Sequence, residues 1–188
     1  MHAQKVRSAM TRQIDLKGMI RTIADFPKPG IQFRDITTLL KVPLGFHEVV
    51  ERLAAPHVDE AIDKVAAIES RGFIVGAALA YRLGAGFVPI RKKGRLPAEN
   101  FGEDYQLEYG RDRLEMHRDA VAPGERVLLV DDLIATGGTA EAAARLLATA
   151  GASVPGCAFV VDLPDLGGRR KLEALGYRVQ VLCEFGGC

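Results

Sequence analysis

The sequence predicts an α/β fold built on a mostly parallel β-sheet flanked by helices. Short apolar runs, each long enough for one strand, alternate along the chain with stretches that have the 3.6-residue spacing of amphipathic helices. Uninterrupted apolar runs are typical of strands that helices cover on both faces, as in parallel sheets. The length of 188 residues suits one domain with a substantial core, so we expect a single domain over residues 1–188.

The expected elements begin at residue 14. Apolar residues recur at helical spacing over residues 14–23, which predicts a first helix that the prolines of the DFPKPG segment end. The elements expected after it are a helix at 46–54, a strand at 65–68, a helix at 73–83, strands at 87–90 and 127–130, a helix at 140–150, and strands in the segments GCAFVV and RVQVL.

Two segments do not fit this alternation. One is DFPKPGIQFRDI, residues 25–36, and the other is residues 91–121, which are rich in charge, glycine and tyrosine. Within the second, YQLEY alternates, so Tyr105 and Tyr109 share one face of a strand and Glu108 lies on the other. A glycine then turns the chain toward RLEMH. This pattern predicts a two-stranded flap, and long connections of this kind are often lids.

Composition and charge exclude several classes of function. The formal net charge of +1 provides no basic field for nucleic acid. The four histidines are scattered, so we expect no zinc site built from protein side chains, and no apolar run is long enough to cross a membrane. Three cysteines without a C-x-x-C pair, and a start without the features of a signal peptide, favour reduced thiols and a cytoplasmic location.

The segment VLLVDDLIATGGT, residues 127–139, carries the clearest chemical signal. Asp131 and Asp132 directly follow an apolar strand, at the edge of a parallel sheet where ligands bind, although two adjacent carboxylates repel each other. The small residues that follow open a helix, and free amides at a helix start attract anions. Acceptors for sugar hydroxyls beside a phosphate cradle indicate a phosphorylated ribose. A capped helix alone would explain one aspartate, but not the pair and the Gly-Gly turn.

This segment resembles the phosphoribosyl pyrophosphate motif of the type I phosphoribosyltransferases. Three further blocks resemble the adenine enzymes of that group in order and spacing: IRTIADFPKPGIQFRDITTLL, ESRGFIVGAALAYRLGAGFVPIRKKGRLP and YQLEYGRDRLEMHRDA. The resemblance implies the type I phosphoribosyltransferase fold, with a helix and hood over the base at 13–40 and a flexible flap at 91–121. It also implies transfer of ribose 5-phosphate from phosphoribosyl pyrophosphate to adenine, which gives AMP and pyrophosphate, with Mg²⁺ on the pyrophosphate and a cytoplasmic homodimer.

The same resemblance assigns residues to the ribose, to its 5′-phosphate and to the pyrophosphate. Asp131 and Asp132 would bind the ribose hydroxyls. The 5′-phosphate would be held by Ala135, Thr136, Gly137, Gly138 and Thr139. Pyrophosphate would be bound by Ser70, Arg71, Arg91, Lys92 and Arg95. Arg95 stands where the family usually has lysine, and the bond between Glu69 and Ser70 is expected to be cis. The alternative interpretation of Arg71 is an ordinary surface ion pair.

The remaining roles that the resemblance implies concern the base. Phe33 would stack on adenine, and the backbone of Gln32 and Arg34 would pair with its edge, unless Phe33 is only a core anchor. Glu108 would exchange a proton with the imidazole ring of the purine, unless it is a solvated carboxylate. Tyr109 would pack over the ligand.

The choice of base depends on one position. Hypoxanthine–guanine relatives carry an aspartate within the motif where this chain has Ala135, which favours adenine and leaves Glu108 as the proton carrier. Two alternatives are a xanthine or other purine enzyme and a regulator that senses phosphoribosyl pyrophosphate without catalysis. Such regulators usually carry a DNA-binding domain, and only thirteen residues precede Ile14, so we do not expect one here.

Overall fold

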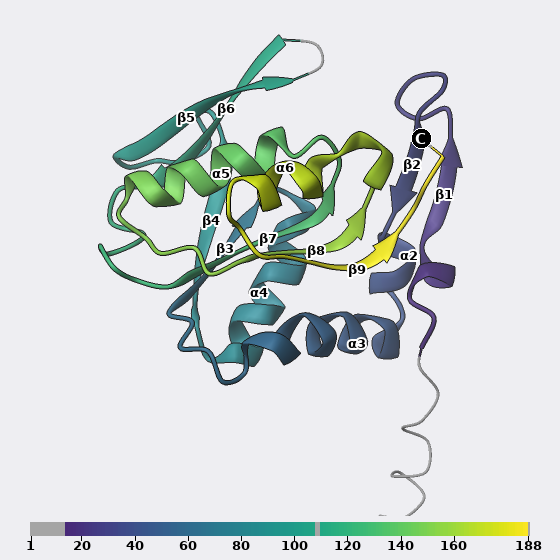
Figure 1. The fold of residues 1–188 in the computed structure, drawn as a ribbon, viewed down its shortest axis with the longest axis horizontal. Helices are drawn as coiled ribbons and strands as arrows, with labels where there is room; N and C mark the ends of the chain where they lie inside the picture. Colours follow the sequence, from purple (N-terminus) through teal and green to yellow (C-terminus); the bar gives the residue numbers. More distant parts are fainter. Residues whose placement is uncertain (1–13, 108–109, 188) are drawn as a thin grey trace, which may run out of the picture. The chain divides into compact units, whose positions relative to one another are not determined.

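The computed structural model describes residues 14–107 and 110–187 (Figure 1). The contacts between residues divide the chain into two compact units, the first ending at Glu48 and the second beginning at Val49.

The first unit contains a two-stranded antiparallel sheet. A 3-10 turn at Lys17–Met19 precedes β1 (Arg21–Ala24), which pairs with β2 (Gln32–Asp35) so that Ile23 lies opposite Phe33. The short helix α2 (Thr37–Leu40) follows, and α3 (Pro43–Ala54) begins in this unit. The helix predicted at 14–23 is therefore wrong. The β-branched residues Thr22 and Ile23 favour an extended backbone, and pairing with β2 supplies the hydrogen bonds that a helix would have made internally.

The second unit is built on a seven-stranded sheet in the order β5-β6-β4-β3-β7-β8-β9. The five neighbouring strands β4, β3, β7, β8 and β9 are parallel to one another, and β6 pairs with β4 in the antiparallel direction. The strands are β3 (Lys64–Ile68), β4 (Gly86–Lys92), β5 (Asn100–Leu107), β6 (Gly110–His117), β7 (Val127–Ile134), β8 (Cys157–Asp162) and β9 (Val179–Glu184). The mostly parallel sheet and every strand predicted from an apolar run are confirmed.

Helices cover both faces of this sheet. Figure 1 shows α4 (Arg71–Leu83) on one face, and α5 (Gly138–Thr149) with α6 (Gly168–Ala174) on the other. All six residues of β8 are buried, as a strand between two helical layers requires. On α5 the buried residues include three consecutive alanines, whose small side chains let the helix lie close to the sheet. The helices predicted at 46–54, 73–83 and 140–150 are present with small shifts at their ends.

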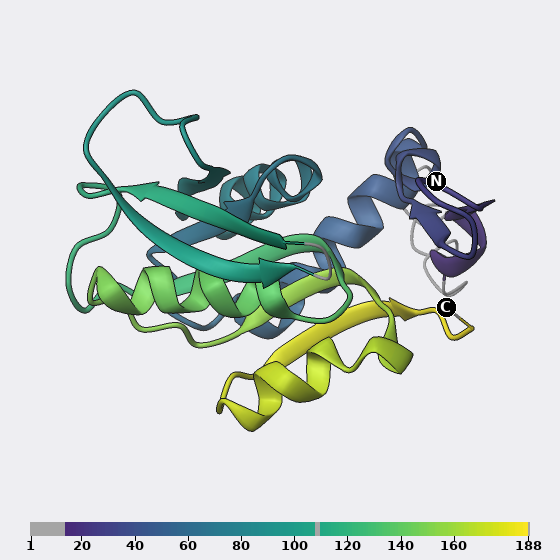
Figure 2. The ribbon, with the colours of Figure 1, turned by 90° about the horizontal axis from the view of Figure 1, so that it is seen from above.

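The predicted two-stranded flap is the hairpin of β5 and β6. Its antiparallel register runs from the pair Asn100 and His117 to the pair Leu107 and Gly110. Figure 2 shows this hairpin beside α5, and Tyr105, Leu114 and Met116 join the buried core there. Within the described residues, no helix is both long enough and apolar enough to cross a membrane.

Candidate active site

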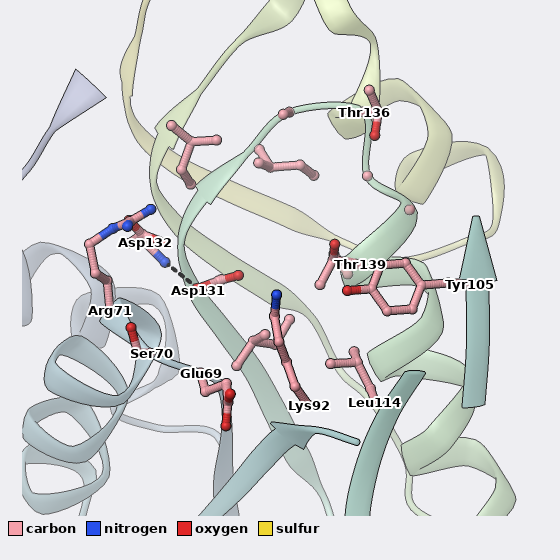
Figure 3. Close-up of a pocket in the computed structure, with 17 residues that line it drawn as sticks. Glu69, Ser70, Arg71, Lys92, Tyr105, Leu114, Asp131, Asp132, Thr136 and Thr139 are labelled. Carbon is pink, nitrogen blue, oxygen red and sulfur yellow. Dashed lines mark hydrogen bonds and ion pairs between the residues drawn. The ribbon is translucent and has the colours of Figure 1, made fainter. Parts of the chain in front are cut away.

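The carboxyl ends of the parallel strands border a pocket of about 570 Å³ (Figure 3). Its lining consists of the turn at 68–71, the motif residues 131–140, and the side chains of Lys92, Tyr105 and Leu114. The turn follows β3 and the motif follows β7, and these two strands are direct neighbours in the sheet. The sequence motif and the ESRG turn therefore lie in one place, as ligand binding at this edge of a parallel sheet requires.

The two motif aspartates lie within β7 rather than after it. The strand was predicted at 127–130, but its pairing with β8 continues to Ile134. Its pairing with β3 stops at Val130, so the residues after Val130 have no paired partner on that side. Asp131 and Asp132 therefore line the pocket, because β3 ends before β7 does.

The two carboxylates have different surroundings. Asp132 is only 5% exposed and accepts a hydrogen bond from Nε of Arg71 at 2.5 Å, as the dashed line in Figure 3 marks. Asp131 accepts a hydrogen bond from the backbone amide of Asp132 at 2.8 Å. Burial, and then the charge of neighbouring Asp132, raise the pKa of Asp131 well above its ordinary value. One aspartate is therefore compensated by a cation, and the other largely lacks compensation.

Gly72 is a contributor that the sequence did not single out. A Cβ atom on this residue would lie 2.6 Å from Oδ1 of Asp131 and 3.2 Å from its Cα. Glycine at this position lets the first turn of α4 approach β7 closely. The available signal was the glycine of the ESRG turn, which lies directly after Arg71 and before the helix predicted at 73–83.

The phosphate loop, residues 135–139, turns β7 into α5. Gly137 has a φ of 79°, which is the left-handed conformation that favours glycine, and α5 begins at Gly138. The first amides of a helix have no acceptor within the helix, so this turn offers donors to an anion. Figure 3 shows Tyr105 pointing toward Thr139, and burial raises the pKa of Tyr105 to about 12. The Tyr105 hydroxyl also lies 3.1 Å from Oδ2 of Asp112.

Three of the five residues predicted for pyrophosphate line the pocket, namely Ser70, Arg71 and Lys92. Arg91 instead donates to Oε2 of Glu69 at 2.8 Å and to the backbone oxygen of Arg95 at 3.1 Å. The side chain of Arg95 is exposed and does not line the pocket. The peptide bond between Glu69 and Ser70 is cis, as expected. Arg71 does form an ion pair, but its partner is a buried motif aspartate and not a surface carboxylate.

The residues predicted for the base lie elsewhere in the chain. Gln32, Phe33 and Arg34 are on β2 of the first unit. The ring of Phe33 is half-buried and stands edge-on to Phe26, with centroids 5.2 Å apart. Nη1 of Arg34 donates to the hydroxyl of Thr22 at 2.6 Å.

Two predicted residues of the flap, Glu108 and Tyr109, lie outside the described residues. Tyr105, for which we predicted only its face of the flap strand, lines the pocket and was missed as a site residue.

Comparison with known proteins identifies the family. The model of the phosphoribosyl transferase domain matches residues 37–180. An adenine phosphoribosyltransferase from Methylobacillus flagellatus is 62% identical over 172 residues, which are 92% of this chain and 98% of that protein. The structure of the adenine phosphoribosyltransferase from Rhodothermus marinus is 54% identical and has a TM-score of 0.86, over 90% of this chain and 96% of that one.

A third relative was solved with ligands. The adenine phosphoribosyltransferase from Saccharomyces cerevisiae, complexed with adenine and D-2,5-dideoxy-2,5-imino-altritol 1,6-bisphosphate, is 38% identical with a TM-score of 0.84, over 90% of this chain and 97% of that one. The resemblance seen in the sequence is thus confirmed over nearly the whole length of both relatives and chain. This chain belongs to the adenine phosphoribosyltransferase family, within the proteins that share the phosphoribosyl transferase domain.

Proposed function

We propose that the chain transfers ribose 5-phosphate from phosphoribosyl pyrophosphate to adenine, giving AMP and pyrophosphate. The observation that carries this proposal is the pocket at the carboxyl edge of the sheet. There, two adjacent carboxylates lie between a phosphate loop and the cationic side chains of Arg71 and Lys92. A ribose with a phosphate at one end and pyrophosphate at the other needs this order of groups. The relatives named adenine phosphoribosyltransferase support adenine as the base.

The chain's own residues would contribute mainly by binding and by electrostatics. Asp131 and Asp132 accept hydrogen bonds from the ribose hydroxyls, while the amides of residues 136–139 hold the 5′-phosphate. Arg71 and Lys92 stand where negative charge develops as pyrophosphate leaves, and fixed charges at such a place stabilise a transition state. Binding both ends of the substrate also fixes the sugar carbon relative to the incoming base.

We infer that Mg²⁺ arrives with the pyrophosphate of the substrate. The pocket offers the carboxylate oxygens of Asp131 and Asp132, which are ligands that Mg²⁺ prefers. When bound, the ion neutralises charge on the leaving group. Arg71 and Lys92 would then complement the ion rather than replace it.

The roles of the base-binding residues stay proposals. Phe33 supplies an aromatic face for adenine, a contact worth about 1–3 kcal/mol per base in other proteins. Gln32 and Arg34 supply backbone groups on the same strand. Glu108 is the proposed proton carrier, because it resembles the flap glutamate of the family and the motif has alanine at position 135. Tyr109 would cover the ligand.

We further propose a cytoplasmic homodimer. The apolar side chains of Ile74, Tyr81 and Phe87 are exposed, and that of Tyr81 is 91% accessible to solvent. Ile74 and Tyr81 are seven residues apart on α4 and share one face of that helix. Clustered exposed apolar residues are typical of protein interfaces. The buried thiols of Cys157 and Cys183 suit a reducing compartment.

An assay of four bases tests the proposed function. The purified chain is given phosphoribosyl pyrophosphate, Mg²⁺ and adenine, hypoxanthine, guanine or xanthine in separate reactions, and nucleotide formation is followed. We expect AMP from adenine and negligible product from the other three. Preference for another base would point to a different purine enzyme. Tight binding of phosphoribosyl pyrophosphate without turnover of any base would point to a sensor.

A further inference from the structure

The phosphate loop is held on its outer side by the segment that leads into α6. The backbone amide of Gly168 donates to the carbonyl oxygen of Ala135 at 2.9 Å, and the amide of Leu163 donates to the carbonyl oxygen of Ile134 at 3.0 Å. Gly168 is the first residue of α6 and does not line the pocket. The loop that would bind the 5′-phosphate is therefore attached to backbone that no ligand in the pocket would touch.

The contact between Gly168 and the loop leaves no space for a side chain. A Cβ atom on Gly168 would lie 2.3 Å from the oxygen of Ala135, 2.6 Å from the amide nitrogen of Gly137 and 2.9 Å from Cγ1 of Ile134. In the reverse direction, a Cβ atom on Gly137 would lie 2.9 Å from both Cα and O of Gly168. Two backbone segments thus touch directly, at a pair of glycines 31 positions apart in the sequence.

This contact also orients the loop. In a trans peptide the carbonyl oxygen and the following amide hydrogen point in opposite directions. Because the oxygen of Ala135 points at the amide of Gly168, the amide of Thr136 points away from Gly168. A side chain at position 168 would press on both the Ala135 carbonyl and the Gly137 amide, which flank that donor.

We propose that Gly168 is a positioning residue for the 5′-phosphate. It keeps the amides of the phosphate loop in place through direct backbone contact, without touching the ligand. This inference rests on the proposed function, because it assumes that the loop binds the phosphate of AMP and of phosphoribosyl pyrophosphate.

Two alanine variants provide the test. Gly168→Ala places a methyl group against the loop. Gly167→Ala is the matched control, because Gly167 has a φ of 74° and so also tolerates alanine poorly, but a Cβ atom there would meet only the side chain of Arg170, at 3.5 Å. Both variants should lower the melting temperature. Only Gly168→Ala should change binding through the loop.

Calorimetry with AMP, ribose 5-phosphate and pyrophosphate gives the ligand-specific result. We expect Gly168→Ala to weaken the binding of AMP and ribose 5-phosphate by about tenfold to a hundredfold, which corresponds to the loss of about one hydrogen bond to a charged group. Its affinity for pyrophosphate should be unchanged, and Gly167→Ala should bind all three like wild type. Equal affinity of Gly168→Ala and wild type for AMP would overturn the inference, as would equal losses for all three ligands. If wild type itself binds no AMP, the proposed function fails instead.

Amide hydrogen exchange on wild type keeps the inference testable if Gly168→Ala does not fold. The amide of Gly168 donates to the phosphate loop, so AMP should slow its exchange although this residue lies outside the pocket lining. Pyrophosphate alone should not. Protection by AMP of the loop amides, with unchanged exchange at Gly168, would contradict the proposed coupling.

Discussion

Two strand-to-helix turns border the pocket, and they are built to receive anions in different ways. The turn between β3 and α4 uses charged side chains that already have partners, since Arg71 binds Asp132 and Glu69 binds Arg91. The turn between β7 and α5, residues 135–139, has no charged side chain. It presents a helix start and is shaped by backbone contact with Gly168.

This difference indicates which kind of change should weaken anion binding at each turn. At the first turn, binding of pyrophosphate requires that the cations redistribute their contacts between carboxylates and ligand. Lys92 is in the same situation, with its Nζ 3.3 Å from Oδ2 of Asp112. At the second turn the donors are part of the backbone, and only their position can be altered. Loss of charge should therefore affect mainly the pyrophosphate side, and loss of shape mainly the 5′-phosphate side.

Removal of the divalent ion should have the largest effect and should separate the two sides. In excess chelator, AMP formation is expected to fall to the level of a reaction without enzyme, because a highly charged leaving group then departs without neutralisation. Added Mg²⁺ should restore it. The affinity for ribose 5-phosphate, measured by calorimetry, should survive chelation, because the second turn binds with backbone amides. Full activity in chelator would remove the ion from the mechanism, and loss of ribose 5-phosphate binding would contradict the comparison.

The next largest effect is expected at Glu108, which is the residue proposed to exchange a proton with the purine. Glu108→Gln should lower turnover by about a hundredfold to ten-thousandfold, the usual contribution of general acid–base catalysis, with little change in adenine affinity. Single-turnover measurements would isolate the chemical step. The control is Glu103→Gln on β5, whose side chain binds Arg145 at 2.8 Å and whose replacement should leave turnover nearly unchanged. Normal turnover of Glu108→Gln would direct attention to Asp131, the carboxyl with a raised pKa in the pocket.

These contrasts also show what the sequence could and could not predict. Apolar runs located the parallel strands, and VLLVDDLIATGGT located the pocket, because both signals are local. The helix predicted at 14–23 failed because pairing between β1 and β2 depends on a partner outside that window. The partner of Arg71 is 61 positions away, and Gly168, which contacts the phosphate loop, is the first residue of α6. Local patterns do not encode such contacts. The single domain over 1–188 and the base-binding residues stay predictions.

The aspartates between the two turns should give intermediate effects. Asp131→Asn and Asp132→Asn are each expected to lower the affinity for AMP by about tenfold to a hundredfold, since hydrogen bonds to charged groups contribute about 1.5–3 kcal/mol. Asp132→Asn also removes the carboxylate that binds Arg71, so its affinity for pyrophosphate should be maintained or increased. Calorimetry with both ligands checks this. Normal AMP binding by both variants would show that the pair does not contact the ribose.

The smallest effect concerns stability, and it should distinguish the two aspartates. The pKa of Asp131 is raised in the folded chain, by burial and then by Asp132. An acid of this kind binds its proton more tightly when folded, so its contribution to stability is most favourable below the unfolded pKa of about 3.9 and is lost as the pH rises through the folded pKa. Asparagine has no charge to bury. Asp131→Asn should therefore melt at a higher temperature than wild type at neutral pH, although it binds AMP more weakly.

The pH dependence of that gain is the decisive measurement. Thermal melts of the ligand-free chain should show the advantage of Asp131→Asn disappearing below about pH 4, where the wild-type carboxyl is protonated in both states. For a chain of this size, a gain of 1 kcal/mol would raise the melting temperature by about 2–4 °C. Asp132→Asn should show no gain, because it gives up the pair with Arg71. If both variants are destabilised at neutral pH, Asp131 is already compensated in the free chain. The two aspartates would then be equivalent, and the ligand-free pocket would contain no uncompensated carboxylate.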